Sequence, residues 1–200
     1  MTNTEVLEPL ERVEPDELAR LHTALEKESA ARGILDIAYR TIDTPVGVLL
    51  LAATERGIVR VAFESEGHDA VLAVLADKVS PRILKSPRRL DAPATELDEY
   101  FAGRRTAFDL PLDLSLSKGF RRDVLEHLRN IGYGHTESYS EVALAAGNPR
   151  AVRAVGSACA TNPLPVVVPC HRVLRSDGSL GGYLGGLEAK RTLLALEAAA

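Results

Sequence analysis

Cysteine is scarce in this chain of 200 residues, in which Cys159 and Cys170 are the only two. Two cysteines do not make a disulfide framework, and such scarcity is typical of a reducing compartment, so we expect a cytoplasmic location. No cysteine precedes Cys159, and His22 and His68 lack the spacing of zinc ligands. The sequence therefore predicts no metal site and no other cofactor.

Long hydrophobic runs are also missing. The first 14 residues are acidic and lack the apolar stretch of a signal peptide, and no later segment is long and apolar enough to span a bilayer. We therefore expect no membrane partner. Short apolar runs such as Val166–Val168, with many leucines and alanines, can still bury a core in a chain of this length. These features predict a folded protein of one or two domains.

Positive charge is in deficit in the first part of the chain and in excess in the second. Residues 1–114 contain 14 Lys and Arg against 21 Asp and Glu, a net charge of −7. Residues 115–200 contain 10 against 7, a net charge of +3. The overall charge of −4 argues against a general nucleic-acid binder. The basic second part points to an anionic partner of its own, although an excess of this size is also common in other proteins.

The sequence up to Leu114 has the pattern of a small α/β domain preceded by a helical arm. Residues 1–36 form an acidic arm with a predicted helix over 15–32 that Gly33 ends, and this arm either docks on the body or is loosely held. Alternation predicts strands, helical spacing predicts helices, and a proline-rich basic segment is typical of a loop. The expected strands are 37–42, 46–54, 58–63 and an extended piece over 108–114; the helices are 68–79 and 93–102; the loop is 81–93.

From residue 115 onward, the start signals of helices predict a helix-turn-helix. Ser138 and Glu141 fit a capping box, and Asn148-Pro149 supplies an N-cap followed by a first-turn proline. Two short helices with Gly147 at the corner are typical of this motif. The expected elements are helices over 120–131, 138–147, 149–160 and 187–198, with tight turns of a wing-like excursion at 177–178 and 181–182. A boundary between two domains is expected within residues 114–119.

The helix expected over 149–160 is almost free of large side chains. Val152, Val155 and Cys159 share one face, which we expect to pack inward. The other positions are small, apart from two arginines: they are Arg150, Ala151, Arg153, Ala154, Gly156, Ser157 and Ala158. Such a helix is either a tightly packed interior helix or one whose backbone can approach a duplex closely, with an arginine as the long probe.

The segment Pro169-Cys170-His171-Arg172-Val173, which ends a valine run, has the features of a nucleophile. The thiolate is the reactive form of cysteine, and half-ionisation near pH 7 requires a shift of about 1.5 pKa units, or roughly 2 kcal/mol. A histidine with an acidic partner can supply that shift. The sequence thus predicts Cys170 as a nucleophile with a lowered pKa and His171 as its base. The alternatives are a buried structural thiol and a core histidine.

Five segments of residues 115–200 occur in the order and with the spacing of a known family. They are Ser138-Tyr139, then Ala146 to Gly156, then Asn162-Pro163, then Pro169 to Val173, then Gly182-Tyr183 with Glu197. In these segments the chain resembles the O6-alkylguanine-DNA alkyltransferases, also called methylated-DNA–protein-cysteine methyltransferases. The resemblance implies an α+β fold, with an N-terminal RNase H-like domain over residues 37–114 and a C-terminal winged helix-turn-helix domain over residues 115–200.

The resemblance also implies a role for each matching residue. Cys170 would accept the alkyl group as a thioether, His171 would draw the thiol proton through a water, and Glu197 would orient the imidazole. Asn162 would brace this network, and Tyr139 would assist rotation of the damaged base and departure of the guanine. Arg153 would fill the gap in the base stack. The further implied contacts are Arg150, Ala151, Ala154 and Ser157 to DNA, and Val173, Tyr183 and Leu184 to the base.

The implied function is single-turnover DNA repair in the cytoplasm. The partner would be duplex DNA carrying O6-alkylguanine or, to a lesser degree, O4-alkylthymine, with the target base rotated out of the stack. The helix-turn-helix would enter the minor groove, which suits a helix of small residues. Because lesions occur in any sequence, most contacts would be to phosphate and binding would be salt-sensitive. The resemblance implies a monomer and leaves open whether copies bind DNA cooperatively.

Three other functions remain compatible with parts of the pattern. The first is a lesion binder of the same fold, which would lack the acceptor cysteine, so Cys170 argues against it. The second is a winged-helix regulator whose cysteine senses alkylation or oxidation, which needs an effector surface or a second reactive cysteine. The third is a Cys-His hydrolase, for which a basic helix-turn-helix has no purpose. The alkyltransferase is the function that uses all five segments.

Overall fold

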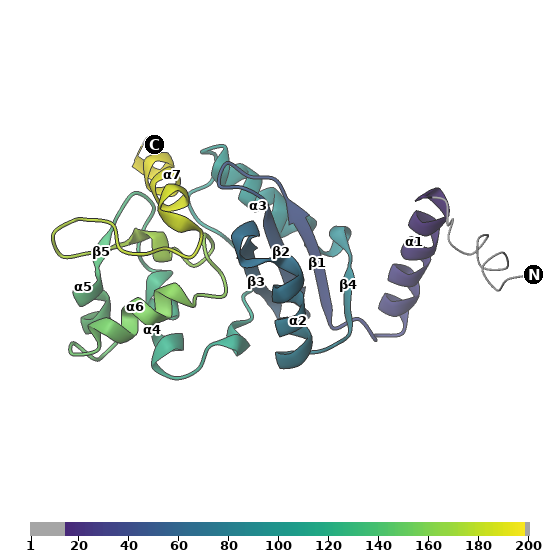
Figure 1. Cartoon of the computed structure of the whole chain (residues 1–200), viewed down its shortest axis with the longest axis horizontal. Coiled ribbons are helices and arrows are strands. Elements are labelled where there is room, and N and C mark those ends of the chain that lie inside the picture. The colour runs from purple at the N-terminus through teal and green to yellow at the C-terminus, as the bar shows by residue number, and fades with distance from the viewer. Residues whose placement is uncertain (1–14, 199–200) are drawn as a thin grey trace, which may run out of the picture.

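The computed structural model describes residues 15–198, and Figure 1 shows a mixed α and β architecture. The elements before residue 115 are α1 (Pro15–Ala31), β1 (Ile37–Ile42), β2 (Leu49–Thr54), β3 (Gly57–Phe63), α2 (His68–Lys78), β4 (Ile83–Lys85) and α3 (Asp91–Phe101). The later elements are α4 (Phe120–Leu128), β5 (Glu137–Ser138), α5 (Tyr139–Ala145), α6 (Val152–Ala160), β6 (Val173–Leu174) and α7 (Gly186–Ala198). Short 3-10 turns include Glu64–Glu66, Pro87–Leu90, Leu114–Leu116 and Cys170–Arg172.

The N-terminal domain is built on a four-stranded sheet in the order β3-β2-β1-β4. β1 and β3 pair with β2 in antiparallel register, and β4 pairs with β1 in parallel. Successive residues of a strand point to opposite faces, and here both faces are buried. Leu50 belongs to a cluster with Val71 and Leu75 of α2, whereas Leu49 and Leu51 belong to a cluster that includes α3. The sheet is therefore covered by a helix on each side (Figure 1).

The cluster on the α3 side continues into the C-terminal domain. It runs from strand residues such as Leu51 through Tyr100 of α3 to Val124 of α4 and Leu193 of α7. Apolar burial is the main favourable term in folding, so one continuous core makes the two domains stabilise each other. The joint is reinforced by the backbone, because the amide of Val61 donates to the carbonyl of Pro163 at 2.8 Å.

The proline-rich loop expected over residues 81–93 is not a simple connector. It contains the strand β4 and a 3-10 turn over Pro87–Leu90, and α3 already begins at Asp91. The sequence does not predict this strand, because the strand is only three residues long and depends on pairing with β1. The pairs include Ile37 with Ile83 and Tyr39 with Lys85. The extended piece expected over 108–114 forms only a bridge between Ile58 and Leu112.

The C-terminal domain contains the expected helix-turn-helix. Ser138 accepts a hydrogen bond from the amide of Glu141, and the Glu141 side chain accepts one from the amide of Ser138, which confirms the capping box. α5 and α6 pack against each other and against α4 (Figure 1). β6 pairs in parallel with β5, which precedes α5 directly. This pairing places the segment after Cys170 beside the start of the helix-turn-helix.

α6 begins three residues later than expected, at Val152 rather than Pro149. The amide of Ala151 bonds to the carbonyl of Asn148, so residues 148–151 form a separate turn before the helix. The predicted inward face is also partly wrong, because Val152 is exposed, while Val155, Ala158 and Cys159 are buried. The error has a simple cause, since Val152 is the first residue of α6 and lies beyond the edge of the core.

The wing is a loop rather than a hairpin of strands. Within it, Arg175 and Gly178 are joined by a turn, and the amide of Arg175 donates to the carbonyl of Ser179. β6 ends at Leu174, and the chain then has no helix or strand until α7 begins at Gly186. The wing returns to the body at Gly185, where an added Cβ would lie 2.6 Å from the ring of Phe63. A glycine is therefore required for this close approach to β3.

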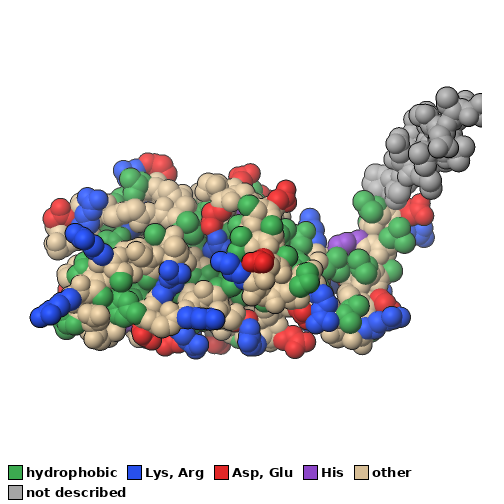
Figure 2. Space-filling model, turned by 60° about the horizontal axis from the view of Figure 1, so that its bottom comes forward, with side chains coloured by type: hydrophobic (Ala, Val, Ile, Leu, Met, Phe, Trp, Pro, Cys, Tyr) green, Lys and Arg blue, Asp and Glu red, His purple; other side chains and the backbone are tan. Residues whose placement is uncertain are grey.

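The helix α1 projects from the body, while residues 1–14 of the acidic arm lie outside the described residues. Gly33 (φ 61°) ends it in the left-handed conformation, as expected. Leu18, Leu21 and Leu25 are exposed, and Figure 2 shows hydrophobic side chains along this projection. One contact to the body is a hydrogen bond between His22 Nε2 and the Lys85 carbonyl at 2.6 Å. No helix within residues 15–198 is long and apolar enough to cross a membrane.

Candidate active site

Cys170 begins a short 3-10 turn at the end of the loop that follows α6. The loop is strained at Val166, which has a φ of 72°, a left-handed conformation that β-branched residues rarely adopt. The residues around it, Leu164 to Cys170, are all buried. This packing on every side is what maintains the strained backbone and fixes the position of the thiol.

Asn162 holds the thiol and its loop together. Its Nδ2 donates to Cys170 Sγ at 3.1 Å and to the Val168 carbonyl at 2.9 Å. Its Oδ1 accepts from the amide of Leu164 at 2.9 Å. Both sides of the amide group are thus used, and Asn162 is fully buried. A hydrogen bond donated to sulfur favours the thiolate over the thiol.

The lowered pKa expected for Cys170 is not what the structure indicates. Burial raises the pKa of the Cys170 thiol to about 11, although the hydrogen bond from Asn162 and the charge of Lys190 act in the opposite direction. Cys170 is only 2% exposed, a fact that the sequence does not reveal. The resting thiol is therefore protonated at neutral pH, so its proton has to leave during the reaction.

His171, the residue after Cys170, forms a buried pair with a carboxylate. Its Nε2 is 2.9 Å from Glu197 Oε1, and both side chains are buried. Its Nδ1 has no hydrogen-bond partner among the described residues. Burial lowers the pKa of His171, although the hydrogen bond to Glu197 raises it, so the imidazole is neutral and can accept a proton. Glu197 would then stabilise the imidazolium that forms.

Glu197 also accepts hydrogen bonds from two side chains, Arg172 and Tyr100, for which the sequence predicts no place in the site. Arg172 donates from Nε to Oε2 and from Nη2 to Oε1, each at 2.9 Å, and Tyr100 of α3 donates to Oε1 at 2.6 Å. Burial opposes ionisation of Glu197, but the hydrogen bonds from His171, Arg172 and Tyr100 outweigh it and lower its pKa to about 2. Arg172 could have been found from its place after His171, whereas nothing in the sequence links Tyr100 to the site.

Lys190 of α7 is a second buried cation near the thiol that the sequence analysis missed. It is fully buried, and its Nζ donates to the Val173 carbonyl at 2.6 Å. Burial lowers its pKa, whereas a thiolate at Cys170 or Cys159 would raise it. The carbonyl of Val173 keeps one lone pair for another donor, because a carbonyl oxygen can accept two hydrogen bonds.

Tyr139 and Tyr183, to which the resemblance gives roles at the base, both lie near Cys170. Tyr139 follows the N-cap of α5, and an added Cβ at Gly181 of the wing would lie 2.2 Å from its hydroxyl. The ring of Tyr183 packs edge-on against the rings of His171, at 6.3 Å, and Phe63, at 5.7 Å. These contacts bring α5, the wing and β3 together, with Tyr183 beside His171.

The residues expected to contact DNA lie mainly on the exposed side of the helix-turn-helix. Arg153, Ala154 and Ser157 are exposed on α6. Arg150 is also exposed, but it belongs to the turn before α6, and Ala151 is the half-buried N-cap of the helix. Leu184 is half-buried at the edge of a cavity between the domains. No group of three or more His, Cys, Asp or Glu side chains within residues 15–198 could hold a metal ion.

A buried cysteine held by an asparagine and followed by a histidine-glutamate pair, in the loop after a helix-turn-helix, is the combination expected of a DNA-binding protein with a functional thiol. Two family models match the chain: the ribonuclease-like domain of 6-O-methylguanine DNA methyltransferase over residues 37–114, and its DNA-binding domain over residues 119–199. The chain therefore belongs to the O6-methylguanine DNA methyltransferase family, the methylated-DNA–protein-cysteine methyltransferases that repair DNA.

Individual relatives agree with this assignment. The chain is 42% identical over 161 residues to a methylated-DNA–protein-cysteine methyltransferase of Mycolicibacterium paratuberculosis, covering 80% of this chain and 92% of the relative. A crystal structure of the Mycobacterium tuberculosis O6-methylguanine methyltransferase matches with a TM-score of 0.70 at 37% identity, covering 82% of this chain and 93% of that chain. A structure from the same organism in complex with DNA matches with a TM-score of 0.68 at 38% identity, covering 81% and 93%.

Proposed function

We propose that Cys170 is the acceptor of the alkyl group in single-turnover repair of O6-alkylguanine and, to a lesser degree, O4-alkylthymine in duplex DNA. Cys170 Sγ attacks the alkyl carbon, the carbon–oxygen bond breaks, and its electron pair remains on the base oxygen. The thiol proton passes to His171 through a water. The departing base anion takes up a proton at a ring nitrogen from the imidazolium through solvent, and Tyr139 assists its departure. The observation that supports this proposal is the pair of hydrogen bonds on adjacent residues, from Asn162 to the thiol of Cys170 and between His171 and Glu197.

We also propose that the base reaches Cys170 by displacing part of its cover. The thiol is buried, and it lines neither of two cavities, of about 440 and 370 Å³, that the structure contains. The wing residues Gly181 to Leu184 lie between Tyr139 and Phe63 with no strand to hold them. Movement of this loop would open a path to the thiol, with backbone groups of Val173 and Leu184 at the edge of the base and Tyr183 beside it.

Contacts to DNA are assigned to the exposed part of the helix-turn-helix. Arg153 would enter the stack in place of the rotated nucleotide, while Arg150, Ala151, Ala154 and Ser157 would lie along the minor groove. We further propose that a monomer acts alone on each lesion. Cys159 and Cys170 are both free thiols, and this supports action in the cytoplasm. We propose no cofactor, because the thiol displaces the base directly and the transfer needs no further reactant.

The test is transfer of a labelled methyl group from O6-methylguanine in a duplex. We expect one label per protein molecule, found on Cys170 by mass spectrometry, and no transfer to the Cys170→Ser variant. Cys159→Ser is the matched control, because it removes the other buried thiol, and it should accept one label like the natural chain. Repeated turnover, or a label that persists in Cys170→Ser, would contradict the proposal.

A further inference from the structure

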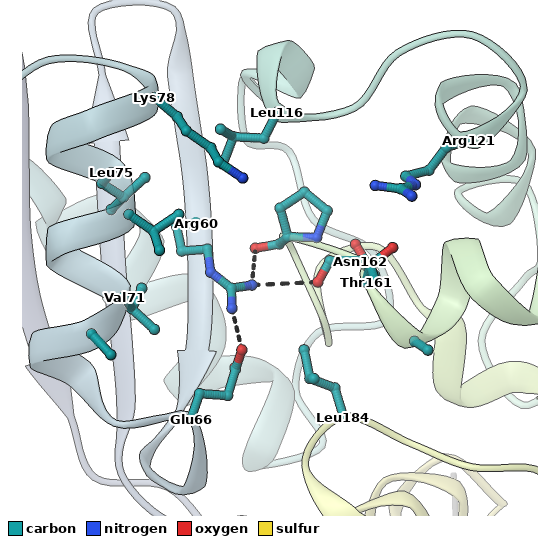
Figure 3. Close-up of a pocket in the computed structure, with 14 residues that line it drawn as sticks. Arg60, Glu66, Val71, Leu75, Lys78, Leu116, Arg121, Thr161, Asn162 and Leu184 are labelled. Atoms are coloured by element: carbon teal, nitrogen blue, oxygen red, sulfur yellow. Dashed lines mark hydrogen bonds and ion pairs between the residues drawn. The ribbon is translucent and has the colours of Figure 1, made fainter.

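A cavity of about 440 Å³ lies between the two domains beside Asn162. One wall comes from α2 and β3 of the N-terminal domain, and the other comes from α4, the end of α6 and Leu184 of the wing. Figure 3 shows these walls facing each other across an open space. The cavity therefore touches both the helix assigned to DNA and the domain to which no DNA contact has been assigned.

The charges around this cavity are mostly positive. Arg60, Lys78 and Arg121 line it, against the single carboxylate of Glu66. The charge and donors of Arg60 already have partners within the protein, since Arg60 pairs with Glu66 and donates to the carbonyls of Asn162 and Pro163. That leaves two cations, Lys78 and Arg121, whose charge no lining carboxylate balances.

Lys78 and Arg121 extend into the cavity from opposite domains. Lys78 ends α2 and Arg121 is the second residue of α4, and Figure 3 shows both side chains directed toward the space between them. Both are exposed, and neither makes a hydrogen bond or an ion pair with any residue in the described part of the chain. Two unpaired cations facing one space repel each other, so an anion between them is favoured.

The exposed stripe of α6 leads into the same cavity. Arg153, Ser157 and Thr161 are spaced by four residues and share one side of the helix, and all three are exposed. The hydroxyls of Ser157 and Thr161 both donate to backbone carbonyls of the helix. These short side chains therefore do not project from the helix surface. Eight residues of helix advance about 12 Å, which corresponds to only three or four phosphates along one DNA strand.

We propose that Lys78 and Arg121 bind the phosphate backbone of DNA that runs past the end of α6, so that the N-terminal domain takes a direct part in DNA binding. This inference rests on the proposed function, because it assumes that α6 lies on the DNA. Lys and Arg side chains are present along the face of both domains seen in Figure 2. A free phosphate would use the same two cations, but the stripe that leads from Arg153 to the cavity favours a continuous backbone.

The test is the salt dependence of binding to an unmodified duplex, measured by fluorescence anisotropy with the full chain. Each phosphate contact contributes about 0.9 to the slope of log K against log salt. We expect Lys78→Ala and Arg121→Ala each to reduce the slope by about one and to weaken binding about eightfold at 0.1 M KCl. Arg88→Ala is the matched control: it removes an exposed arginine next to β4, at the edge of the sheet away from β3, and should leave the slope unchanged.

Two further measurements separate the possible failures. Methyl transfer to Cys170 from the free base O6-methylguanine should be the same in all of these variants, because the free base has no phosphate. Loss of that transfer throughout would contradict the proposed function rather than this inference. An unchanged salt slope for Lys78→Ala would overturn the inference, as would an equal effect of Arg88→Ala. So would an outcome in which inorganic phosphate stabilises the natural chain, but not the double variant, while duplex affinity is unaltered.

Discussion

Glu197 accepts hydrogen bonds from Tyr100, His171 and Arg172, and Oε1 alone accepts from all three side chains. A carboxylate in water would satisfy these lone pairs with solvent, but a buried one depends on its protein partners. Each donor lowers the share of negative charge available to the others. The strength with which Glu197 supports the imidazole is therefore set by Tyr100 and Arg172 as well as by His171 itself.

Tyr100→Phe tests this dependence. Without the phenol, Oε1 no longer shares its negative charge with Tyr100 and interacts more strongly with His171. The pKa of His171 should therefore rise, and the acid limb of the methyl-transfer rate should move to higher pH. Stability should fall by about 1.5–3 kcal/mol, the usual worth of a hydrogen bond to a charged group. The measurements are single-turnover transfer between pH 5 and 8 and urea unfolding of the same variant.

Tyr133→Phe is the matched control for that experiment. Tyr133 lies beside Tyr100, with ring centroids 6.0 Å apart, but its hydroxyl bonds to the Leu196 carbonyl rather than to Glu197. Its removal should leave the pH profile in place. If Tyr100→Phe lost stability with the same pH profile as the natural chain, Tyr100 would be a structural residue only.

At the scale of single residues, the sequence predicted which residues belong to the site better than it predicted their burial and protonation. Cys170, His171 and Asn162 lie within ten residues, so their proximity could be predicted from the sequence. Whether a thiol is solvated or buried depends on segments far away in sequence, and the expected sign of the Cys170 pKa shift was wrong for that reason. Tyr100 could not be found at all, because the joint between the domains brings it to Glu197.

Among the elements, the helices with strong local signals were predicted well. The capping box of α5 is complete within four residues, and α4 shows its apolar spacing within nine. β4 and the start of α6 were wrong, since one depends on pairing with a distant strand and the other on a turn that competes with the helix. Elements that are specified by local contacts are thus accessible from sequence, and those completed by tertiary contacts are not.

Gly57 provides a test of how the connecting segment is attached to the sheet. Its φ is 133°, and an added Cβ would lie 2.1 Å from the carbonyl oxygen of Pro111. The backbone around Pro111 is held there by bonds between Ile58 and both Pro111 and Asp113. Gly57→Ala should therefore displace this segment and lower the free energy of unfolding by more than backbone strain alone, which costs about 1–3 kcal/mol.

Gly47→Ala separates the clash from the strain. Gly47 also has a positive φ, of 94°, but nothing lies within 4 Å of an added Cβ. Urea unfolding should show a smaller loss for Gly47→Ala than for Gly57→Ala. Equal losses would mean that the segment around Pro111 moves freely and does not depend on close contact with β3.

The whole molecule depends on a charged cluster at the joint between its domains. Tyr100 comes from the N-terminal domain, whereas Arg172 and Glu197 come from the C-terminal domain, and all three are buried. A buried charge that loses its partner is strongly destabilising. The cluster that orients His171 is therefore also one that holds the two domains together, and its protonation should be visible in the stability of the entire chain.

Stability should accordingly fall in acid in two steps. The pKa of Glu197 is about 2 in the folded chain, against 4.5 for an ordinary glutamate, so its contribution is complete above pH 4.5 and is lost as pH falls toward 2. The pKa of His171 is lowered by burial, so the unfolded chain takes up a proton first, and stability also falls as pH drops below about 6.5. Both effects have the same sign, and urea unfolding from pH 7 to pH 2 measures their sum.

Glu197→Gln assigns the lower step to one carboxylate. The variant should lose about 3–5 kcal/mol at pH 7, because Arg172 is left buried without a charged partner. Below pH 4.5 its stability should fall less steeply than that of the natural chain, because glutamine has no proton to gain. Glu188→Gln, on the exposed side of the same helix, should keep the natural slope. If the natural chain and Glu197→Gln showed the same slope between pH 4.5 and 2, the acid sensitivity would arise from other carboxylates, and the cluster would not be what couples the domains to the site.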